Sequence, residues 1–281
     1  MKFTFLGTSG WEQYPGLWCA CANCKKALEK GGKNIRANAC AWLEPDILLD
    51  LPPQIFFQSM RCGVDIRKAR CLLVTHAHDD HFAPHWLWGR KLYGDEKNRD
   101  YSPRFSELPQ LRIFGNATVY DKVRAIMDKD PGGYAMEVTK VEPFRKYATA
   151  DITFIGLPAN HHDNENRGLN YIIEKNGKTL LYALDSGYFL PESLAEIKKH
   201  KFDLVVAEGT YGYGAESETH CNFRKLEEIY NMFVDAKLLK NGSRFCVSHI
   251  SPHFTPIHED IAPVMAEKGI TIAYDGLKLN L

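Results

Sequence analysis

The chain has 281 residues, of which 44% are hydrophobic and 25% are charged. This composition is typical of a folded globular protein, and 35 basic side chains balance 35 acidic ones, so no overall charge would attract nucleic acid or an anionic membrane. The sequence contains no linker, low-complexity tract or short repeat, and we therefore predict a single domain over residues 1–281.

The amino-terminal segment, residues 1–7, predicts a short strand that ends in a glycine turn. It lacks the apolar region and the cleavage site of a secretory signal, and no apolar run in the chain is long enough to span a bilayer. We therefore expect a cytoplasmic protein, in which the eight cysteines stay reduced and serve as metal ligands or core residues.

Three cysteines follow this strand closely: Cys19, Cys21 and Cys24. In a predicted loop, three thiolates so close together can wrap a tetrahedral metal ion, whereas pairing as disulfides would leave one over. A structural zinc site would need a fourth ligand, and the best candidate is His253 near the carboxyl end. The alternative is a group of small buried or redox-active thiols.

Apolar or alternating runs recur along the chain and predict strands. These runs are Ala39–Trp42, Ile47–Leu49, Arg70–Val74, Leu111–Phe114, Ile152–Leu157, Leu169–Ile173, Thr179–Ala183, Leu204–Ala207, Arg244–Val247 and Ile270–Ala273. Helical patterns fall at Ala117–Asp128, Pro191–His200, Phe223–Leu239 and Ile257–Lys268. Strands with helices between some of them indicate an α/β protein.

The charged and aromatic segment 89–109 has no clear period, and we interpret it as a surface excursion and a candidate lid over the site.

The densest polar motif directly follows the strand predicted at 70–74 and spans residues 75–81. It holds three histidines and two aspartates, whose nitrogens and oxygens are the ligands that zinc and similar divalent metals prefer. So many polar groups cannot share a core without partners, and the alternative to a metal site is a solvated polar turn. Three further polar residues, His161, Asp185 and His249, follow other predicted strands.

Together these residues provide enough ligands for a pair of metal ions. We expect one set of histidines to hold the first ion, a mixed set to hold the second, and an aspartate to bridge them. The first set is His76, His78 and His161, the second set is Asp80, His81 and His249, and the bridging residue is Asp185. Zinc, manganese and iron are all compatible with such ligands, and we expect zinc or manganese.

The order of these motifs, from the strand at Phe3–Gly7 to the closing Ile272–Gly276, resembles the metallo-β-lactamase superfamily along essentially the whole chain. The resemblance implies an α/β four-layer αββα sandwich with two metals at the strand-end edge between its sheets. Position 185 is Asp where the antibiotic-degrading members carry Cys, and position 78 is His where the flavo-diiron oxidoreductases carry Glu. Both differences favour a hydrolytic, oxygen-bridged metal pair.

Within the superfamily, the chain is most similar to the phosphodiesterase family of the carbon–phosphorus lyase pathway. That family shares the amino-terminal Cys-x-Cys-x-x-Cys and a carboxyl-terminal histidine motif, whose counterpart here spans residues 249–253. The resemblance implies that Cys19, Cys21, Cys24 and His253 hold a structural zinc. It also implies that His220 faces the substrate phosphate.

We therefore predict a metal-dependent phosphodiesterase that acts on small or cyclic phosphodiesters. Asp80 would orient the nucleophile, and His220 would donate a proton to the leaving group or bind the phosphate. Trp86 and Trp88 would line the pocket or, alternatively, pack as core aromatics. Three other functions stay open: a non-catalytic carrier of the type found in quinone-cofactor biosynthesis, a nuclease or transfer-RNA-processing enzyme, and a zinc-dependent interaction module.

The expected partner is a small-molecule phosphodiester substrate. Neither a membrane nor a nucleic acid is expected, because the chain is neutral overall and has no glycine-rich basic insert that would serve as an RNA-binding arm. A homodimer is one oligomeric state that the sequence leaves open.

Overall fold

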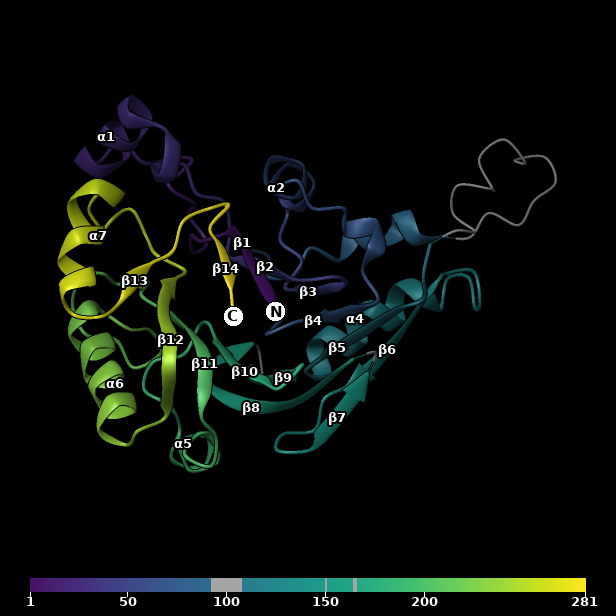
Figure 1. Cartoon of the computed structure of the whole chain (residues 1–281). Coiled ribbons are helices and arrows are strands. Elements are labelled where there is room, and N and C mark those ends of the chain that lie inside the picture. Colours follow the sequence, from purple (N-terminus) through teal and green to yellow (C-terminus); the bar gives the residue numbers. More distant parts are fainter. Residues whose placement is uncertain (92–107, 150, 164–165) are drawn as a thin grey trace.

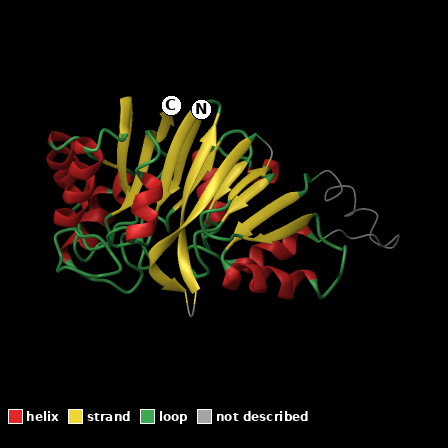
Figure 2. Ribbon diagram, turned by 90° about the horizontal axis from the view of Figure 1, so that it is seen from below, coloured by secondary structure: helices red, strands yellow, loops and turns green. Residues whose placement is uncertain are grey.

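The computed structural model describes residues 1–91, 108–149, 151–163 and 166–281. These residues form two seven-stranded sheets that pack face to face, with helices on the outer faces (Figures 1 and 2). The predicted α/β four-layer sandwich is thus confirmed. The first and last strands pair with each other, and the amino group of Met1 lies 3.1 Å from the backbone oxygen of Leu281.

The strand order is β14-β1-β2-β3-β4-β5-β6 in the first sheet and β13-β12-β11-β10-β9-β8-β7 in the second. The first sheet contains β1 (Lys2–Gly7), β2 (Cys40–Leu43), β3 (Ile47–Leu49), β4 (Cys71–Leu73), β5 (Leu111–Gly115), β6 (Met136–Lys140) and β14 (Lys278–Asn280). The second contains β7 (Lys146–Thr149), β8 (Ile152–Asp163), β9 (Asn166–Lys175), β10 (Lys178–Ala183), β11 (Phe202–Glu208), β12 (Leu239–Ser248) and β13 (Thr271–Ile272).

The α-helices are α1 (Ala22–Lys30), α2 (Ile55–Cys62), α4 (Ala117–Met127), α5 (Pro191–Ile197), α6 (Phe223–Asp235) and α7 (His258–Glu267). Short 3-10 helices are η1 (Gly32–Asn34), η2 (Ile66–Lys68) and η3 (Pro84–Arg90). No helix in the described part of the chain is both long enough and apolar enough to cross a membrane.

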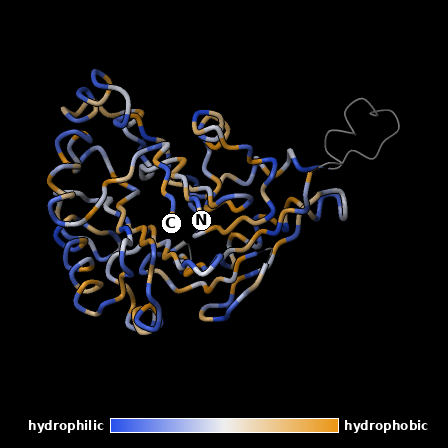
Figure 3. Tube along the Cα trace, viewed as in Figure 1, coloured by the Kyte–Doolittle hydropathy of each residue, from blue (hydrophilic) through white to orange (hydrophobic). Residues whose placement is uncertain are grey.

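Three clusters of buried apolar side chains fill the spaces between the four layers. The middle cluster, between the sheets, includes Phe3 of β1 and Leu180 of β10. A second cluster packs α6 and α7 against one sheet, and a third packs α2 and α4 against the other. Figure 3 shows hydrophobic residues concentrated along the strands and hydrophilic ones along the outer helical turns. Burial of each large apolar side chain contributes roughly 1.5–3 kcal/mol.

The strands of each sheet nearest the functional loops run parallel. In the first sheet β3 pairs with β4 and β4 with β5, and in the second β10 pairs with β11 and β11 with β12, all in parallel. Because the carboxyl ends of parallel strands lie at one edge of a sheet, the loops that follow them gather there. This edge therefore collects the polar segments that the sequence places after the strands.

The predicted strands all coincide with observed ones, but some predicted boundaries are wrong. The helix predicted over Phe223–Leu239 ends at Asp235, because Lys237 adopts a left-handed conformation and Leu239 begins β12. The cysteine cluster is not entirely in a loop, since Cys24 lies within α1. Most of the predicted excursion at 89–109 lies outside the described residues.

Candidate metal centre

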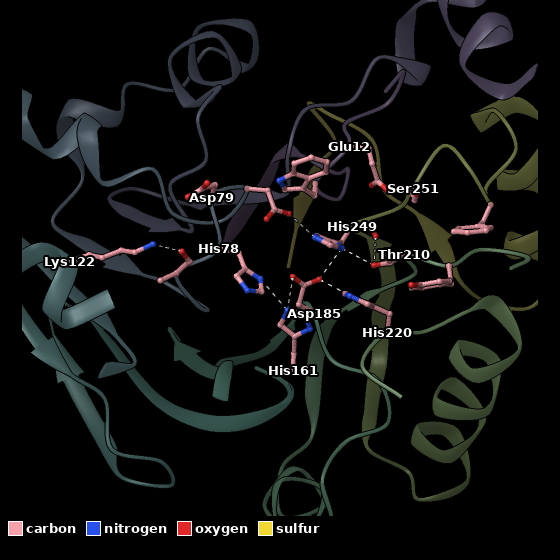
Figure 4. A pocket seen from close by; sticks show the side chains of 15 residues that line it. Glu12, His78, Asp79, Lys122, His161, Asp185, Thr210, His220, His249 and Ser251 are labelled. Carbon is pink, nitrogen blue, oxygen red and sulfur yellow. Dashed lines mark hydrogen bonds and ion pairs between the residues drawn. The ribbon is translucent and has the colours of Figure 1, made fainter. Parts of the chain in front are cut away.

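The predicted ligands reach one site from four strand ends. The motif at 75–81 follows β4, His161 lies near the end of β8, Asp185 follows β10 and His249 follows β12. Figure 4 shows the side chains of His78, His161, Asp185 and His249 pointing toward a common centre.

The backbone is strained at the points where the chain turns into this site. Asp50, Asp185 and His249 have φ angles of 64°, 42° and 55°, in the left-handed region that non-glycine residues seldom adopt. Each such residue costs on the order of 1 kcal/mol or more, a cost that packing elsewhere must offset. Strain of this kind is typical of functional sites.

The first group of converging donors consists of His76, His78, His161 and Asp185, whose ligand atoms all lie within 4.8 Å of one another. The Nδ1 atom of His78 is 3.0 Å from Nε2 of His76 and 3.2 Å from Nε2 of His161. The Nδ1 atom of His78 cannot form good hydrogen bonds with both of these nitrogens, because a ring nitrogen has only one hydrogen or one lone pair in the plane of the ring. Three nitrogens that face one point are better explained as lone pairs directed at a cation.

The second group consists of Asp80, His81, Asp185 and His249, again within 4.8 Å of one another. The Nε2 atoms of His81 and His249 are 3.1 Å apart, and Oδ2 of Asp80 is 3.4 Å from each of them. Asp185 belongs to both groups: its Oδ2 atom is 3.2 Å from Nε2 of His76 and 3.1 Å from Nε2 of His81. A carboxylate shared in this way is positioned between two ion-sized centres.

Buried polar atoms without partners show that these residues fit a pair of divalent ions. Oδ1 of Asp185 makes no hydrogen bond, although Nδ1 of His249 is only 3.1 Å away. Asp185 and His249 are almost completely buried, and an unpaired buried carboxylate oxygen is costly. A bound cation would satisfy it, and the nitrogen–oxygen donor set suits zinc and other first-row divalent metals.

The electrostatics of the site also suit metal binding. Burial lowers the pKa of His161 to about 3 and also lowers the pKa of His76, so both imidazoles are neutral at neutral pH and can offer lone pairs. Burial opposes ionisation of Asp185, but the neighbouring His249 and His81 outweigh it and hold the pKa of Asp185 well below its usual range. Asp185 is therefore anionic.

A buried aspartate that the sequence analysis missed supports two of the histidines. Oδ2 of Asp50 is 2.9 Å from Nδ1 of His81, and both oxygens of Asp50 accept from the Thr75 hydroxyl at 3.0–3.1 Å. Because that hydroxyl donates to Asp50, it can only accept from Nδ1 of His76, 3.1 Å away. Asp50 thus fixes the proton on Nδ1 of both rings, so Nε2 is the nitrogen that each ring can offer to a metal. The carboxylates of Asp80 and Asp185 outweigh burial and raise the pKa of His81, so a metal ion would displace a proton from its Nε2.

Glu208, at the end of β11, supports His249 in the same way, and the sequence analysis missed it as well. Its Oε2 atom accepts from the hydroxyl of Thr210 at 2.5 Å. The hydroxyl therefore accepts from Nδ1 of His249, 2.8 Å away, which leaves Nε2 of His249 bare. Oε1 of Glu208 is 3.4 Å from Nδ1 of His220, and Oδ1 of Asp185 is 3.6 Å from the same nitrogen.

His220 lies beside the donor groups and not within either of them. Burial lowers its pKa, but the carboxylates of Glu208 and Asp185 outweigh burial and raise the pKa to about 9. The imidazole is therefore a hydrogen-bond donor in the metal-free protein, as a group facing phosphate or a leaving oxygen must be.

The three cysteines of the amino-terminal cluster form a separate group, with sulfur atoms within 4.8 Å of one another. Cys21 caps the first turn of α1, and its sulfur accepts from the backbone N–H of Cys24 at 3.4 Å. Nδ1 of His253 lies 3.7 Å from the sulfur of Cys19 but is not part of the compact group. The structure therefore brings the four predicted residues together, with His253 at the edge.

A cavity of about 600 Å³ opens onto the two donor groups. Its lining includes His78, Asp80, Asp185 and His220, which were expected, and also Lys122, which was not. The amine of Lys122 donates to the backbone oxygen of Ala77 at 2.7 Å and places a positive charge at the mouth (Figure 4). A lone lysine in a helix carries no signal that sequence analysis could use.

The two tryptophans that follow the motif at 75–81 neither line the cavity nor pack in the core, so both predictions for them are wrong. Trp86 and Trp88 lie on η3 and are 41% and 49% exposed, so they are not core residues. Neither of them lines the cavity over the two donor groups. Trp11, which the sequence analysis did not single out, lines it instead.

Comparisons with known proteins agree with this architecture. The family model described as "Beta-lactamase superfamily domain" matches residues 46–250. Among solved structures, a diphosphatase from the PhnP family is 21% identical, with a TM-score of 0.72 over 99% of this chain and 96% of that chain. Zinc-bound PqqB from Methylobacterium extorquens is 17% identical, with a TM-score of 0.69 over 100% of both chains.

Human tRNase Z, short form, is 15% identical to this chain, with a TM-score of 0.66 over 100% of this chain and 99% of that one. At these identities the structures share the fold, and their substrates do not transfer to this chain. No curated protein matches the sequence significantly.

Proposed function

The chain belongs to the beta-lactamase superfamily, and we propose that it is a phosphodiesterase that uses two divalent metal ions to hydrolyse small or cyclic phosphodiesters. The proposal rests on the carboxylate of Asp185, which both donor groups share. Its Oδ2 atom is within 3.2 Å of a histidine nitrogen from each donor group. A protein that held one ion would not need two such groups around one carboxylate.

The remaining residues around the cavity have the chemistry that phosphoryl transfer requires. Two bound divalent ions would lower the pKa of water and neutralise the charge on phosphoryl oxygens. Oδ2 of Asp80 faces the second donor group, 3.4 Å from Nε2 of both His81 and His249, so Oδ1 can orient the attacking water. His220, whose Nδ1 atom is 3.4 Å from Oε1 of Glu208, can donate a proton to the leaving oxygen or a hydrogen bond to the phosphate.

Two features favour a small phosphodiester. The cavity of about 600 Å³ is of a size that suits a small molecule. Position 185 is Asp, a hard oxygen ligand that suits a metal pair acting on phosphate. The likeness to a diphosphatase from the PhnP family supports a phosphate compound as the substrate.

We further propose that Cys19, Cys21, Cys24 and His253 hold a structural zinc ion. The closeness of the three sulfurs and the contact of 3.7 Å between Cys19 and His253 support this assignment. The cytoplasmic location stays a prediction from the sequence.

The test is hydrolysis of bis(p-nitrophenyl) phosphate and of 2′,3′-cyclic nucleotides by protein loaded with zinc or manganese. We expect turnover of phosphodiesters and little turnover of lactams or thioesters. Asp185→Asn should abolish the activity while circular dichroism shows the fold to be retained. A fully metallated protein that cleaves no phosphodiester in such a panel would instead favour a non-catalytic carrier.

A further inference from the structure

A second cavity of about 620 Å³ adjoins the one over the metal ligands. Four residues line both cavities: Trp11, Glu12, Asp79 and Asp80. Because the carboxylate of Asp80 is itself in a metal-ligand group, the second cavity begins at the proposed metal centre. We call this second cavity the tryptophan groove.

Large apolar side chains are unusually exposed along the tryptophan groove. Trp11, Leu17 and Trp18 line it and are 70%, 73% and 94% exposed. Exposed apolar side chains that lie together along one groove, and not singly, are typical of a binding site. The groove then continues past Pro53 and Gln54 at the start of α2.

The acidic side chains that line the tryptophan groove are Glu12, Asp79 and Asp80, and its neutral polar side chains include Asn38 and Gln54. Glu12 and Asp79 stand where the two cavities join, and Figure 4 shows both on the same side of the metal ligands. The Glu12 side chain is 32% exposed and lies 3.8 Å from Nε2 of His253. Oε1 of Gln54 is buried without a hydrogen-bond partner.

The two cavities therefore differ in charge. Lys122 lines the cavity over the metal ligands, whereas within the described part of the chain no lysine or arginine lines the tryptophan groove. A second phosphate or a nucleic-acid backbone would meet the carboxylates of Glu12 and Asp79 there. The basic side chain of the described lining is His253, which already lies 3.8 Å from Glu12. A cationic group would be attracted by those carboxylates and by the faces of the indole rings.

We infer that the tryptophan groove binds a positively charged alkylammonium arm of the substrate, such as a quaternary ammonium group, while the phosphate lies at the metal centre. This inference rests on the proposed function, because the metal centre is what would anchor the phosphate. It narrows the substrate class to phosphodiesters with one cationic ester arm. The indole rings would surround the ammonium group, and Glu12 and Asp79 would supply the opposite charge.

The experiment compares the affinity of metal-loaded protein for two monoesters of the same shape, measured by isothermal titration calorimetry. Phosphocholine carries a quaternary ammonium group, and 3,3-dimethylbutyl phosphate carries a neutral tert-butyl group in its place. Inorganic phosphate serves as the reference. We expect phosphocholine to bind about 3- to 30-fold more tightly than the neutral ester, the range of a cation–π contact.

Single-residue variants then show which side chains cause the preference for phosphocholine. Trp18→Ala, Trp11→Ala and Glu12→Gln should each bring the ratio of the two affinities toward one, while binding of inorganic phosphate is kept. Trp88→Phe is the matched control, because it changes an exposed tryptophan that lines neither cavity, and it should leave the ratio unchanged.

Equal affinity for the two esters would overturn the inference, and so would a preference for phosphocholine that survives all three variants. Tighter binding of adenosine monophosphate than of phosphocholine, lost in Trp18→Ala, would overturn it in favour of a stacked base. Because the readout is binding, a protein that hydrolyses no phosphodiester but still prefers phosphocholine would disprove the proposed function and keep the groove assignment.

Discussion

At the scale of single residues, the side chains that converge on the site could be predicted, and the carboxylates that support them could not. His76, His78 and His81 lie within a few positions of one another, and such density has no packing explanation. Asp50 and Glu208 are single carboxylates that end apolar strands, and many solvated carboxylates look the same in a sequence. Only the structure shows that both are buried and that each fixes the proton of a ligand histidine.

The role of Asp50 can be tested by removing its charge. Asp50→Asn no longer fixes the proton on Nδ1 of His81, so we expect metal affinity to fall about 10- to 100-fold, the usual cost of losing such a partner. Competition with a chromophoric chelator measures that affinity. Asp65→Asn is the control, because Asp65 pairs with Arg67 at the surface, at 2.8 Å, away from the site. Unchanged metal affinity in Asp50→Asn would show that Asp50 has only a packing role.

The dependence of the rate on the leaving group distinguishes the two possible roles of His220, as a proton donor and as a phosphate-binding residue. We expect His220→Ala to retain both metals and to lower the rate about 10²- to 10⁴-fold for an alkyl leaving group, which needs a proton. The loss should be smallest for p-nitrophenolate, which leaves without one. Rates for a series of aryl and alkyl phosphodiesters provide the measurement. An equal loss across the series would mean that His220 binds phosphate and does not donate a proton.

At the scale of elements, periodicity located the buried strands and missed the short and edge elements. Strands β6, β7 and β14 went unpredicted, because they are short or half exposed and lack a clear apolar pattern. Helix α2 was missed because it exposes Phe57 and Met60, which are 72% and 66% exposed and blur its two faces. Helix α1 was not predicted, because it begins within the cysteine cluster, which we interpreted as a metal-binding loop.

The link between the cysteine cluster and α1 gives a prediction about stability. Cys21→Ser should remove one metal equivalent per chain and lower the melting temperature, because a structural zinc contributes directly to folding. Differential scanning calorimetry and elemental analysis measure the two effects. Cys62→Ser changes a buried cysteine outside the cluster and should keep the full metal content. A Cys21→Ser protein with unchanged metal content would refute the zinc assignment.

At the scale of the whole molecule, the resemblance in motif order implied the architecture, and the structure supplied the shapes of the cavities. We propose that residues 1–281 form one domain, since β1 and β14 pair and the clusters between the layers draw on both halves of the chain. The tryptophan groove could not be predicted, because Trp11 and Trp18 approach Gln54 and His253 only in the folded chain. The lid predicted at 89–109 falls mainly on residues that are not described.

The most direct test of a dinuclear centre is the metal content of protein purified without chelators, measured by elemental mass spectrometry and compared with the protein concentration. We predict about three divalent ions per chain, two at the centre that shares Asp185 and one at the cysteine cluster. In Asp185→Asn the count should fall toward one, since the cysteine cluster is untouched. A fully occupied wild-type protein that holds a single ion would contradict the dinuclear centre.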